Sequence, residues 1–290
     1  DSQGNVFFGF RVQGTAPSPL GTTQSGFARI APDGSGTYVL AGAAAGDTSI
    51  TRDSHNSAPA LGNDDRVLYV VVKSGTTNNY GYLLGLDATT LGTKFKVFLR
   101  DPRNNRVNNA GILDDSTASP MVAPDGDVFL GVFANPGNGS RGFLLHFTAD
   151  LAVERTPGAF GWDSSPAIVP ATMVPSYTGS AAYLIFTKYN NYAISDGDGV
   201  NRIALLDPTA TQIDPHITAA GLVEMREVLT VIGPVPDTGS LTPAFPNAVR
   251  EWCINTAVAD PISKAILANS EDGKLYRWDM GGAPNTTITL

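Results

Sequence analysis

The sequence predicts an all-β protein built from repeated four-stranded antiparallel units. Turn-forming residues are frequent, with 31 glycines and 20 prolines, only 16% of the residues are charged, and one pattern of apolar runs recurs along the 290 residues. Glycine and proline close tight turns, so their abundance favours many short strands over long helices. A chain of this length can bury a large core, and all-β folds of this size often form one domain.

Each repeat begins with a small or polar residue, a proline and an apolar pair, then a turn and a second apolar run. This pattern predicts two adjacent antiparallel strands. It occurs in three segments and, with its proline displaced to 261, in a looser fourth: HNSAPALGNDDRVLYVVV (55–72), DDSTASPMVAPDGDVFLGVF (114–133), WDSSPAIVP (162–170) with AAYLIFTKY (181–189), and EWCINTAVADPISKAILANS (251–270).

A third apolar run and a fourth β-prone segment complete each repeat. The third runs end in turns whose Asp can accept a hydrogen bond from the amide two residues on; they are YGYLLGLDATTLG (80–92), RGFLLHFTADLA (141–152), VNRIALLDPTAT (200–211) and GKLYRWDMGG (273–282). The fourth segments are KFKVFL (94–99), GAFGW (158–162), REVLTVIG (226–233) and NTTITL (285–290). Four strands per unit, repeated every roughly 45 to 60 residues, are typical of the blades of a β-propeller.

The N-terminal region fits the same pattern but starts late. GNVFFGF (4–10), SGFARIAPDGSG (25–36) and TYVLAG (37–42) are predicted as the second, third and fourth strands of a first blade that lacks its inner strand. We therefore expect one β-propeller domain over residues 1–290 with five blade units. Because 285–290 already serves as a fourth strand, we expect either that the natural chain extends beyond residue 290 as part of a larger ring or that the ring closes imperfectly.

Several of these segments also resemble a known family. Ser-Ala-Pro-Ala, Ser-Pro-Met-Val and Ser-Pro-Ala-Ile, with DGDVFLGV and LLGLDATTLG, are similar to the repeats of quinoprotein-type (PQQ-like) β-propellers, and TKYNNYAISDGDGVNRIALLDP and REWCINTAVADPISKAILANSEDGKLYRWD are similar to exported bacterial proteins of that class. Dehydrogenases of the family hold PQQ above a Ca²⁺ ion and beneath adjacent cysteines. Cys253 is the only cysteine here, so that pair cannot form. We expect no PQQ-dependent dehydrogenase and no organic cofactor.

Charge and hydropathy exclude two classes of partner. The net charge of −8 and the pI near 4.8 argue against nucleic acid, because nucleic-acid binders need clustered Lys and Arg. No apolar run reaches the roughly 18 residues that a membrane-spanning helix needs. The low lysine content and the abundant Thr and Asn favour an exported protein, extracellular or periplasmic.

One end of the predicted channel is the candidate ligand site. Residues just before each inner strand converge there in the predicted blade register, and TKYNNY (187–192) adds hydrogen-bonding and aromatic groups. The predicted ligand-binding set is Arg52, His55, Asp115, Trp162, Asp163, Lys188, Tyr189, Asn190, Glu251 and Trp252. Carboxylates beside aromatic rings suit a sugar. Polar residues that only cap turns or bridge blades are the structural alternative.

A second candidate site lies in SDGDGVN (195–201). Its Asp196, Asp198 and Asn201 offer oxygen ligands on a glycine-rich backbone, as Ca²⁺ requires. Two interpretations remain open here: a structural Ca²⁺ site, or an Asp-Gly hairpin loop without metal.

The predicted function is a non-enzymatic secreted or periplasmic module that binds a protein or a glycan. The insertions at 103–113 and 212–250 are long and Pro-rich or polar, which makes them candidate partner-binding loops. The alternative is a carbohydrate-active enzyme, a glycosidase or lyase, that uses Asp115, Asp163 and Glu251. That alternative requires these three carboxylates to lie around one cavity, with two of them within about 10 Å of each other.

Overall fold

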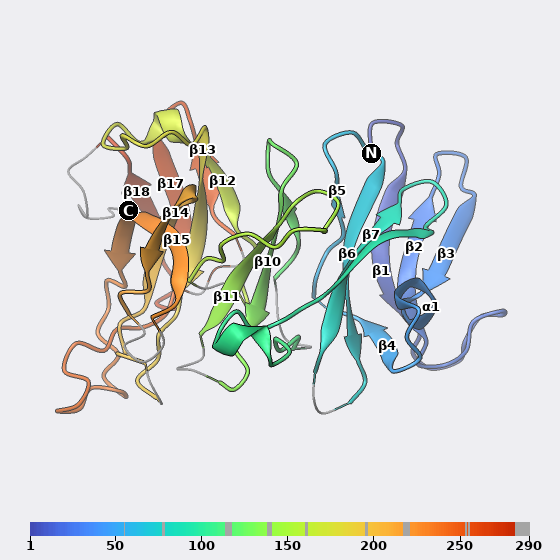
Figure 1. The fold of residues 1–290 in the computed structure, drawn as a ribbon, viewed down its shortest axis with the longest axis horizontal. Coiled ribbons are helices and arrows are strands. Elements are labelled where there is room, and N and C mark those ends of the chain that lie inside the picture. Colours follow the sequence, from blue (N-terminus) through green and yellow to red (C-terminus); the bar gives the residue numbers. More distant parts are fainter. Residues whose placement is uncertain are drawn as a thin grey trace.

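The protein consists of five antiparallel β-sheets that follow one another along the chain, as the computed structural model shows (Figure 1). The structure describes residues 1–54, 56–76, 79–113, 118–137, 141–159, 162–194, 197–216, 221–252, 254 and 256–281.

The first two sheets occupy the N-terminal part of the chain. The first contains β1 (Val6–Arg11), β2 (Ser25–Ile30) and β3 (Gly36–Leu40), and is followed by the short helix α1 (Ala41–Ala45). The second contains β4 (Ile50–Asp53), β5 (Ala60–Leu61), β6 (Val67–Ser74), β7 (Gly81–Asp87) and β8 (Thr93–Phe98). Both β4 and β5 pair with β6, and β7 and β8 follow in order.

The remaining sheets repeat the same up-and-down order. The third contains β9 (Met121–Val122), β10 (Val128–Phe133) and β11 (Gly142–Phe147). The fourth contains β12 (Ala167–Pro170), β13 (Tyr183–Tyr189), β14 (Arg202–Ile213) and β15 (Val223–Ile232). The fifth contains β16 (Val258–Asp260), β17 (Ala265–Asn269) and β18 (Leu275–Asp279). Two 3₁₀ turns, Asn104–Arg106 and Ala171–Met173, lie between strands.

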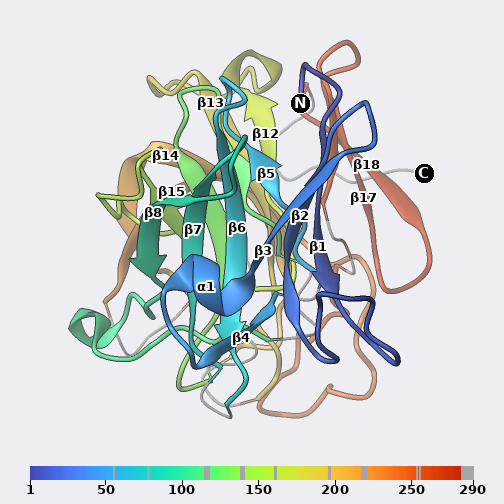
Figure 2. The same cartoon turned by 90° about the vertical axis from the view of Figure 1, so that its right-hand side faces the viewer.

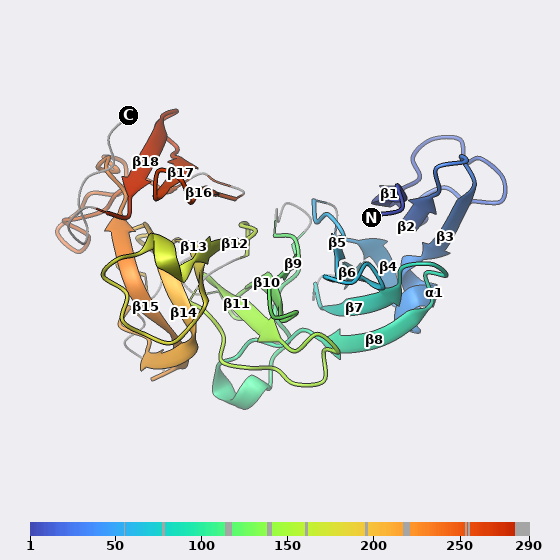
Figure 3. The same ribbon diagram turned by 90° about the horizontal axis from the view of Figure 1, so that it is seen from above.

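The sheets stand side by side in an open arc (Figure 3). The first strand of each sheet lies toward the inside of the arc and the last strand toward the outside. Four larger core clusters fill the spaces between consecutive sheets: first and second, second and third, third and fourth, fourth and fifth. None of these clusters, which comprise described residues, joins the fifth sheet to the first.

The central strands are apolar on both faces because each lies between two neighbouring sheets. In β6, Leu68, Val70 and Val72 pack toward the first sheet, whereas Tyr69 and Val71 pack toward the third. Successive side chains of a strand point to opposite faces, so one run of apolar residues supplies two cores. This explains why the second strand of each repeat reads as a continuous apolar run.

Aspartates set the turns that end the third strands. The Oδ1 atom of Asp87 accepts a hydrogen bond from the amide of Thr89 at 3.0 Å. The same bond, two residues on, is made at the corresponding turns by Asp150, Asp207 and Asp279. The turn chemistry predicted for the repeats is confirmed at all four positions.

Helix α1 is the main element that the sequence pattern did not predict. It lies between the first and second sheets (Figure 2), where Ala41, Ala44 and Ala45 are buried against Ile50 and apolar residues of the second sheet. Alanine has the highest helix propensity, and its small side chain lets the helix approach the sheet closely. The chain leaves the helix at Gly46, whose φ of 58° is left-handed.

The strand predictions are otherwise largely confirmed. The first three strands match the late-starting N-terminal unit, and the second and fourth sheets contain the four predicted strands. The predicted fourth strand at 158–162 is wrong in its described part, because Gly158 makes only an isolated bridge with Leu144. The predicted strand at 285–290 lies outside the described residues. In the described part of the chain, no helix is long and apolar enough to cross a membrane.

Candidate functional site

Lys188 brings together two of the predicted carboxylates. It lies near the end of β13, and its side chain is almost fully buried. Its Nζ atom is 2.8 Å from Oδ2 of Asp163 and 3.8 Å from Oε2 of Glu251. Asp163 precedes β12 and Glu251 precedes the fifth sheet, so the ammonium group links segments that lead into two neighbouring sheets.

Glu251 is also held by two residues that follow β13. Its Oε2 atom accepts a hydrogen bond from Nδ2 of Asn190 at 2.6 Å and another from the hydroxyl of Tyr192. Burial raises the pKa of Tyr192, and the hydrogen bond to Glu251 raises it further. We call Asp163, Lys188, Asn190, Tyr192 and Glu251 the Lys188 cluster.

The spacing of the two carboxylates meets the distance part of the condition set by the enzyme alternative, whereas the third carboxylate, Asp115, lies outside the described residues. Since both contact one Nζ atom, their nearest oxygens are no farther apart than the two contact distances combined, which is inside the roughly 10 Å limit. Burial raises the pKa of Asp163, although Lys188 acts in the opposite direction. A raised pKa is what a general acid needs.

Three predicted aromatic residues lie elsewhere. Tyr189 points to the face of β13 opposite Lys188, because neighbouring strand residues alternate, and its hydroxyl donates to Oδ1 of Asp214 at 3.3 Å. Trp252 is fully buried in the core between the fourth and fifth sheets. Trp162 packs edge-on against Phe133, with ring centroids 5.2 Å apart.

The other predicted ligand-binding residues are not placed in the Lys188 cluster. Arg52 lies on β4 in the second sheet, opposite Lys73 on β6. His55, Asp115 and the predicted metal ligand Asp196 lie outside the described residues. Their roles stay predictions.

The two described residues of the predicted Ca²⁺ site serve the local structure. Asp198 accepts two hydrogen bonds from Arg202, at 2.8 and 3.3 Å, and one from Asn191 at 2.8 Å. Asn201 accepts from the amide of Asn191 at 2.7 Å and donates to the carbonyl of Val249 at 2.8 Å. Neither residue belongs, with other described side chains, to a group of three or more metal-ligating His, Cys, Asp or Glu residues.

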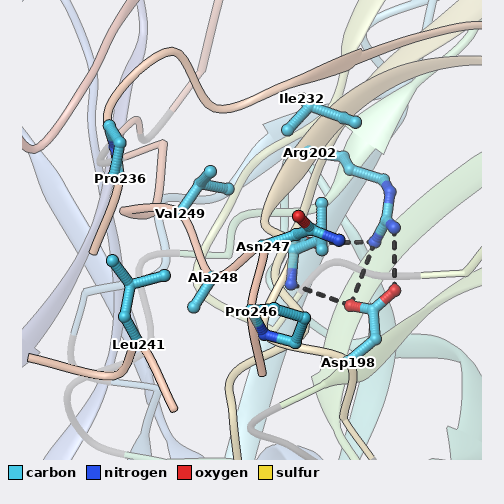
Figure 4. Close-up of a pocket in the computed structure, with 10 residues that line it drawn as sticks. Asp198, Arg202, Ile232, Pro236, Leu241, Pro246, Asn247, Ala248 and Val249 are labelled. Atoms are coloured by element: carbon cyan, nitrogen blue, oxygen red, sulfur yellow. Dashed lines mark hydrogen bonds and ion pairs between the residues drawn. The ribbon is translucent and has the colours of Figure 1, made fainter. Parts of the chain in front are cut away.

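A pocket of about 770 Å³ opens beside the loop that contains Asp198 and Val200 (Figure 4). Its lining is mostly apolar, from Ile232, Pro236, Leu241, Pro246 and Val249, and the Asp198–Arg202 ion pair stands at one side.

Backbone hydrogen bonds hold the segment 233–250 that forms the outer wall of this pocket. The amide of Gly233 donates to the carbonyl of Asn201, and the amide of Val249 donates to the carbonyl of Gly199. Within the segment, the amide of Asp237 donates to the carbonyl of Ala248, and the amide of Arg250 donates to the carbonyl of Val235. The pocket is therefore preformed, and its wall lies within the insertion predicted to bind partners.

A buried charge cluster was not predicted from the sequence. Arg141 and Asp214 form an ion pair of 2.8 Å with both side chains fully buried. Burial, with a further contribution from Asp214, raises the pKa of Glu224 to about 9. Arg141 directly precedes β11 and Glu224 lies on β15, so only the packing of the third sheet against the fourth reveals their proximity.

Comparisons with known proteins leave the family open. No protein-family model matches the chain, and no curated protein matches it. Among solved structures, the chain is similar to the Dos1 propeller, with a TM-score of 0.44 and 16% identity over 92% of this chain and 66% of that one. It is also similar to a europium-containing methanol dehydrogenase, with a TM-score of 0.44 and 12% identity over 88% of this chain and 46% of that one. The chain spans less than two thirds of either structure.

Proposed function

We propose that the protein is a non-enzymatic β-propeller module of the exported type that binds a protein partner, and that an extended segment of that partner occupies the pocket of Figure 4. The five sheets act as blade units, and no core cluster of described residues joins the fifth sheet to the first. The observation that carries the binding role is the preformed, mostly apolar pocket of about 770 Å³ beside an ion pair.

The lining suits a peptide better than a sugar. Ile232 and Leu241 remain 54% and 41% exposed, which leaves apolar surface for apolar side chains of a partner. Binding sites of this kind combine an apolar lining with a few fixed polar groups that orient the ligand. Arg202 and Asp198 supply such groups, because a guanidinium donates and a carboxylate accepts hydrogen bonds from a peptide backbone.

Selection of peptides from a random display library tests this proposal. We expect the wild-type protein to enrich peptides with at least two apolar residues, and Leu241→Asp, which places a charge in the pocket, to lose them. Val107→Asp is the matched control, because Val107 is 73% exposed and lies outside the pocket lining. Peptides that bind the Leu241→Asp variant as well as the wild type contradict the proposal.

A carbohydrate-active enzyme is the second candidate. Asp163 and Glu251 face one ammonium group, and burial raises the pKa of Asp163 as a general acid requires. The test is hydrolysis of a panel of chromogenic glycosides by the wild type, Asp163→Asn and Glu251→Gln. Turnover that both substitutions abolish favours the enzyme. Absence of turnover on every glycoside, together with peptide binding, favours the binding module.

A further inference from the structure

A polar cavity of about 540 Å³ lies between the third and fourth sheets, and none of its lining residues belongs to the Lys188 cluster or the pocket of Figure 4. Asp125 and Asp127 reach it from the turn before β10, His146 from β11 and Tyr183 from β13. Arg155 also lines it. We call this cavity the Asp127 groove.

His146 gives the groove a buried polar wall. Its ring stacks on Phe129 at 4.1 Å, and its Nε2 atom is 2.8 Å from Oδ2 of Asp127. Burial lowers the pKa of His146, against the opposing effect of Asp127, so the ring is neutral and Nε2 carries the hydrogen that bonds the carboxylate. Nδ1 is then an acceptor, and this buried atom has no hydrogen-bond partner among the described residues.

The charged groups of the groove are held in place by contacts with one another, and some of their hydrogen-bonding atoms have no partner among the described residues. Oδ2 of Asp127 also contacts Nε of Arg155 at 2.7 Å, and the hydroxyl of Tyr183 donates to Oδ2 of Asp125 at 2.8 Å. Within the described part of the chain, neither Oδ1 of Asp127 nor the two terminal nitrogens of Arg155 take part in a hydrogen bond between side chains or with the backbone. A carboxylate acceptor and a guanidinium donor thus stand side by side.

This charge balance selects the class of ligand. Two carboxylates, one guanidinium and a neutral imidazole leave one net negative charge, which disfavours an anion. A simple cation is disfavoured by Arg155. A hydroxyl group both donates and accepts hydrogen bonds, so two neighbouring hydroxyls can donate to Asp127 and accept from Arg155 at the same time. The hydroxyl of Thr209, which donates to Asp207 at 2.7 Å, adds an acceptor at the rim.

We propose that the Asp127 groove is a carbohydrate site that binds the vicinal diol of a neutral sugar residue through Asp127 and Arg155. The site is separate from the pocket proposed for a protein segment, so either proposal can fail without the other.

Saturation-transfer NMR tests the proposal, with glucose, galactose, mannose and xylose as neutral probes and inorganic phosphate and methylammonium as charged probes. We expect at least one sugar to bind the wild-type protein, and Arg155→Ala to weaken that binding about tenfold or more, the loss of about 1.4 kcal/mol. Asp127→Asn should weaken it as well, because the amide offers one acceptor oxygen instead of two.

The controls keep the test decisive. Arg155 is half-exposed, so its replacement by alanine should leave the fold intact, and Arg66→Ala removes the same charge from an exposed turn. Retained sugar binding in Arg66→Ala with loss in Arg155→Ala supports the site. No binding by any of the four sugars, unchanged binding in Arg155→Ala, or preferential binding of phosphate or methylammonium would overturn the proposal.

Discussion

Single residues hold distant segments of this chain together through charge. The positive charge of Lys188 compensates the carboxylates of Asp163 and Glu251, and that of Arg141 compensates the carboxylate of Asp214 in a fully buried ion pair. A buried ion whose partner is removed stays in a medium that solvates it poorly, so such pairs are costly to break. The sequence identified Lys188, Asp163 and Glu251 because they flank predicted strands, but not Arg141 or Glu224, whose meeting depends on how two sheets pack.

Replacement of Lys188 should therefore destabilise the protein more than loss of a surface lysine. We expect Lys188→Met to lower the free energy of unfolding by about 3 kcal/mol at neutral pH, because Asp163 loses its counter-charge in a mostly buried position. Denaturant titration measures this. The control is Lys94→Met, because the Lys94 side chain is 40% exposed and its Nζ atom is 3.8 Å from Oδ2 of Asp87. This substitution should lower the free energy of unfolding by less than about 1 kcal/mol. Equal losses for both variants contradict the assigned role.

Glu224 predicts a pH dependence of stability. Its pKa rises from 4.5 to about 9 in the folded protein, so the folded state holds a proton that the unfolded state releases. The resulting stabilisation is complete below pH 4.5 and is lost as the pH rises to about 9. Glu224→Gln has no such proton to lose. The stability of this variant relative to wild type, from urea titrations, should increase between pH 5 and pH 9; a constant difference would show that Glu224 is ionised in the fold.

At the scale of elements, repeated glycines allow the strands to approach. Gly81 begins β7, and a Cβ atom on it would lie 2.2 Å from the carbonyl oxygen of Val72. Gly142 begins β11, and a Cβ atom on it would lie 1.9 Å from the carbonyl oxygen of Val132. Both strands were predicted from their apolar runs, but the need for glycine at these positions depends on register, which the sequence does not reveal. The strand predicted at 158–162 is wrong in its described part, where Gly158 makes only an isolated bridge with Leu144 of β11.

Gly81→Ala should accordingly destabilise the second sheet. We expect a loss of about 1–3 kcal/mol in the free energy of unfolding, because the backbone of β6 or β7 must shift to admit the methyl group. Gly62→Ala is the matched control, since its Cβ would meet no atom closer than 3.5 Å. Thermal and denaturant melts of the two variants provide the comparison. A stability of Gly81→Ala equal to that of Gly62→Ala is the result that this packing forbids.

At the scale of the molecule, each sheet packs mainly on its neighbours in sequence. The four-strand repeat predicted this architecture well, because every repeat carries its own turns and apolar runs. The pockets were harder to predict, because they form where insertions and neighbouring sheets meet: only the position of the insertion at 212–250 was indicated. The Asp127 groove lies at such a junction, and nothing in the sequence pattern indicates that Asp127 and His146 are paired.

The linear stacking of sheets predicts uneven protection along the chain. In the core clusters formed by described residues, the first and fifth sheets each pack on one neighbour, whereas the second, third and fourth sheets each pack on two. Hydrogen exchange followed by mass spectrometry should show the slowest amides in β10, β11, β13 and β14, and faster exchange in β1–β3 and β16–β18. Uniform protection across all five sheets would indicate a closed ring in which no sheet is terminal.

The most direct test of the central claim, a protein-binding module with its site in the pocket of Figure 4, is calorimetric titration of a selected peptide into wild type, Leu241→Asp and Val107→Asp. The account predicts that Leu241→Asp weakens binding of the peptide by at least about tenfold, a loss of about 1.4 kcal/mol in binding free energy. Val107→Asp should bind the peptide with the affinity of the wild type. Equal affinity of the peptide for all three proteins would place binding elsewhere and contradict the claim.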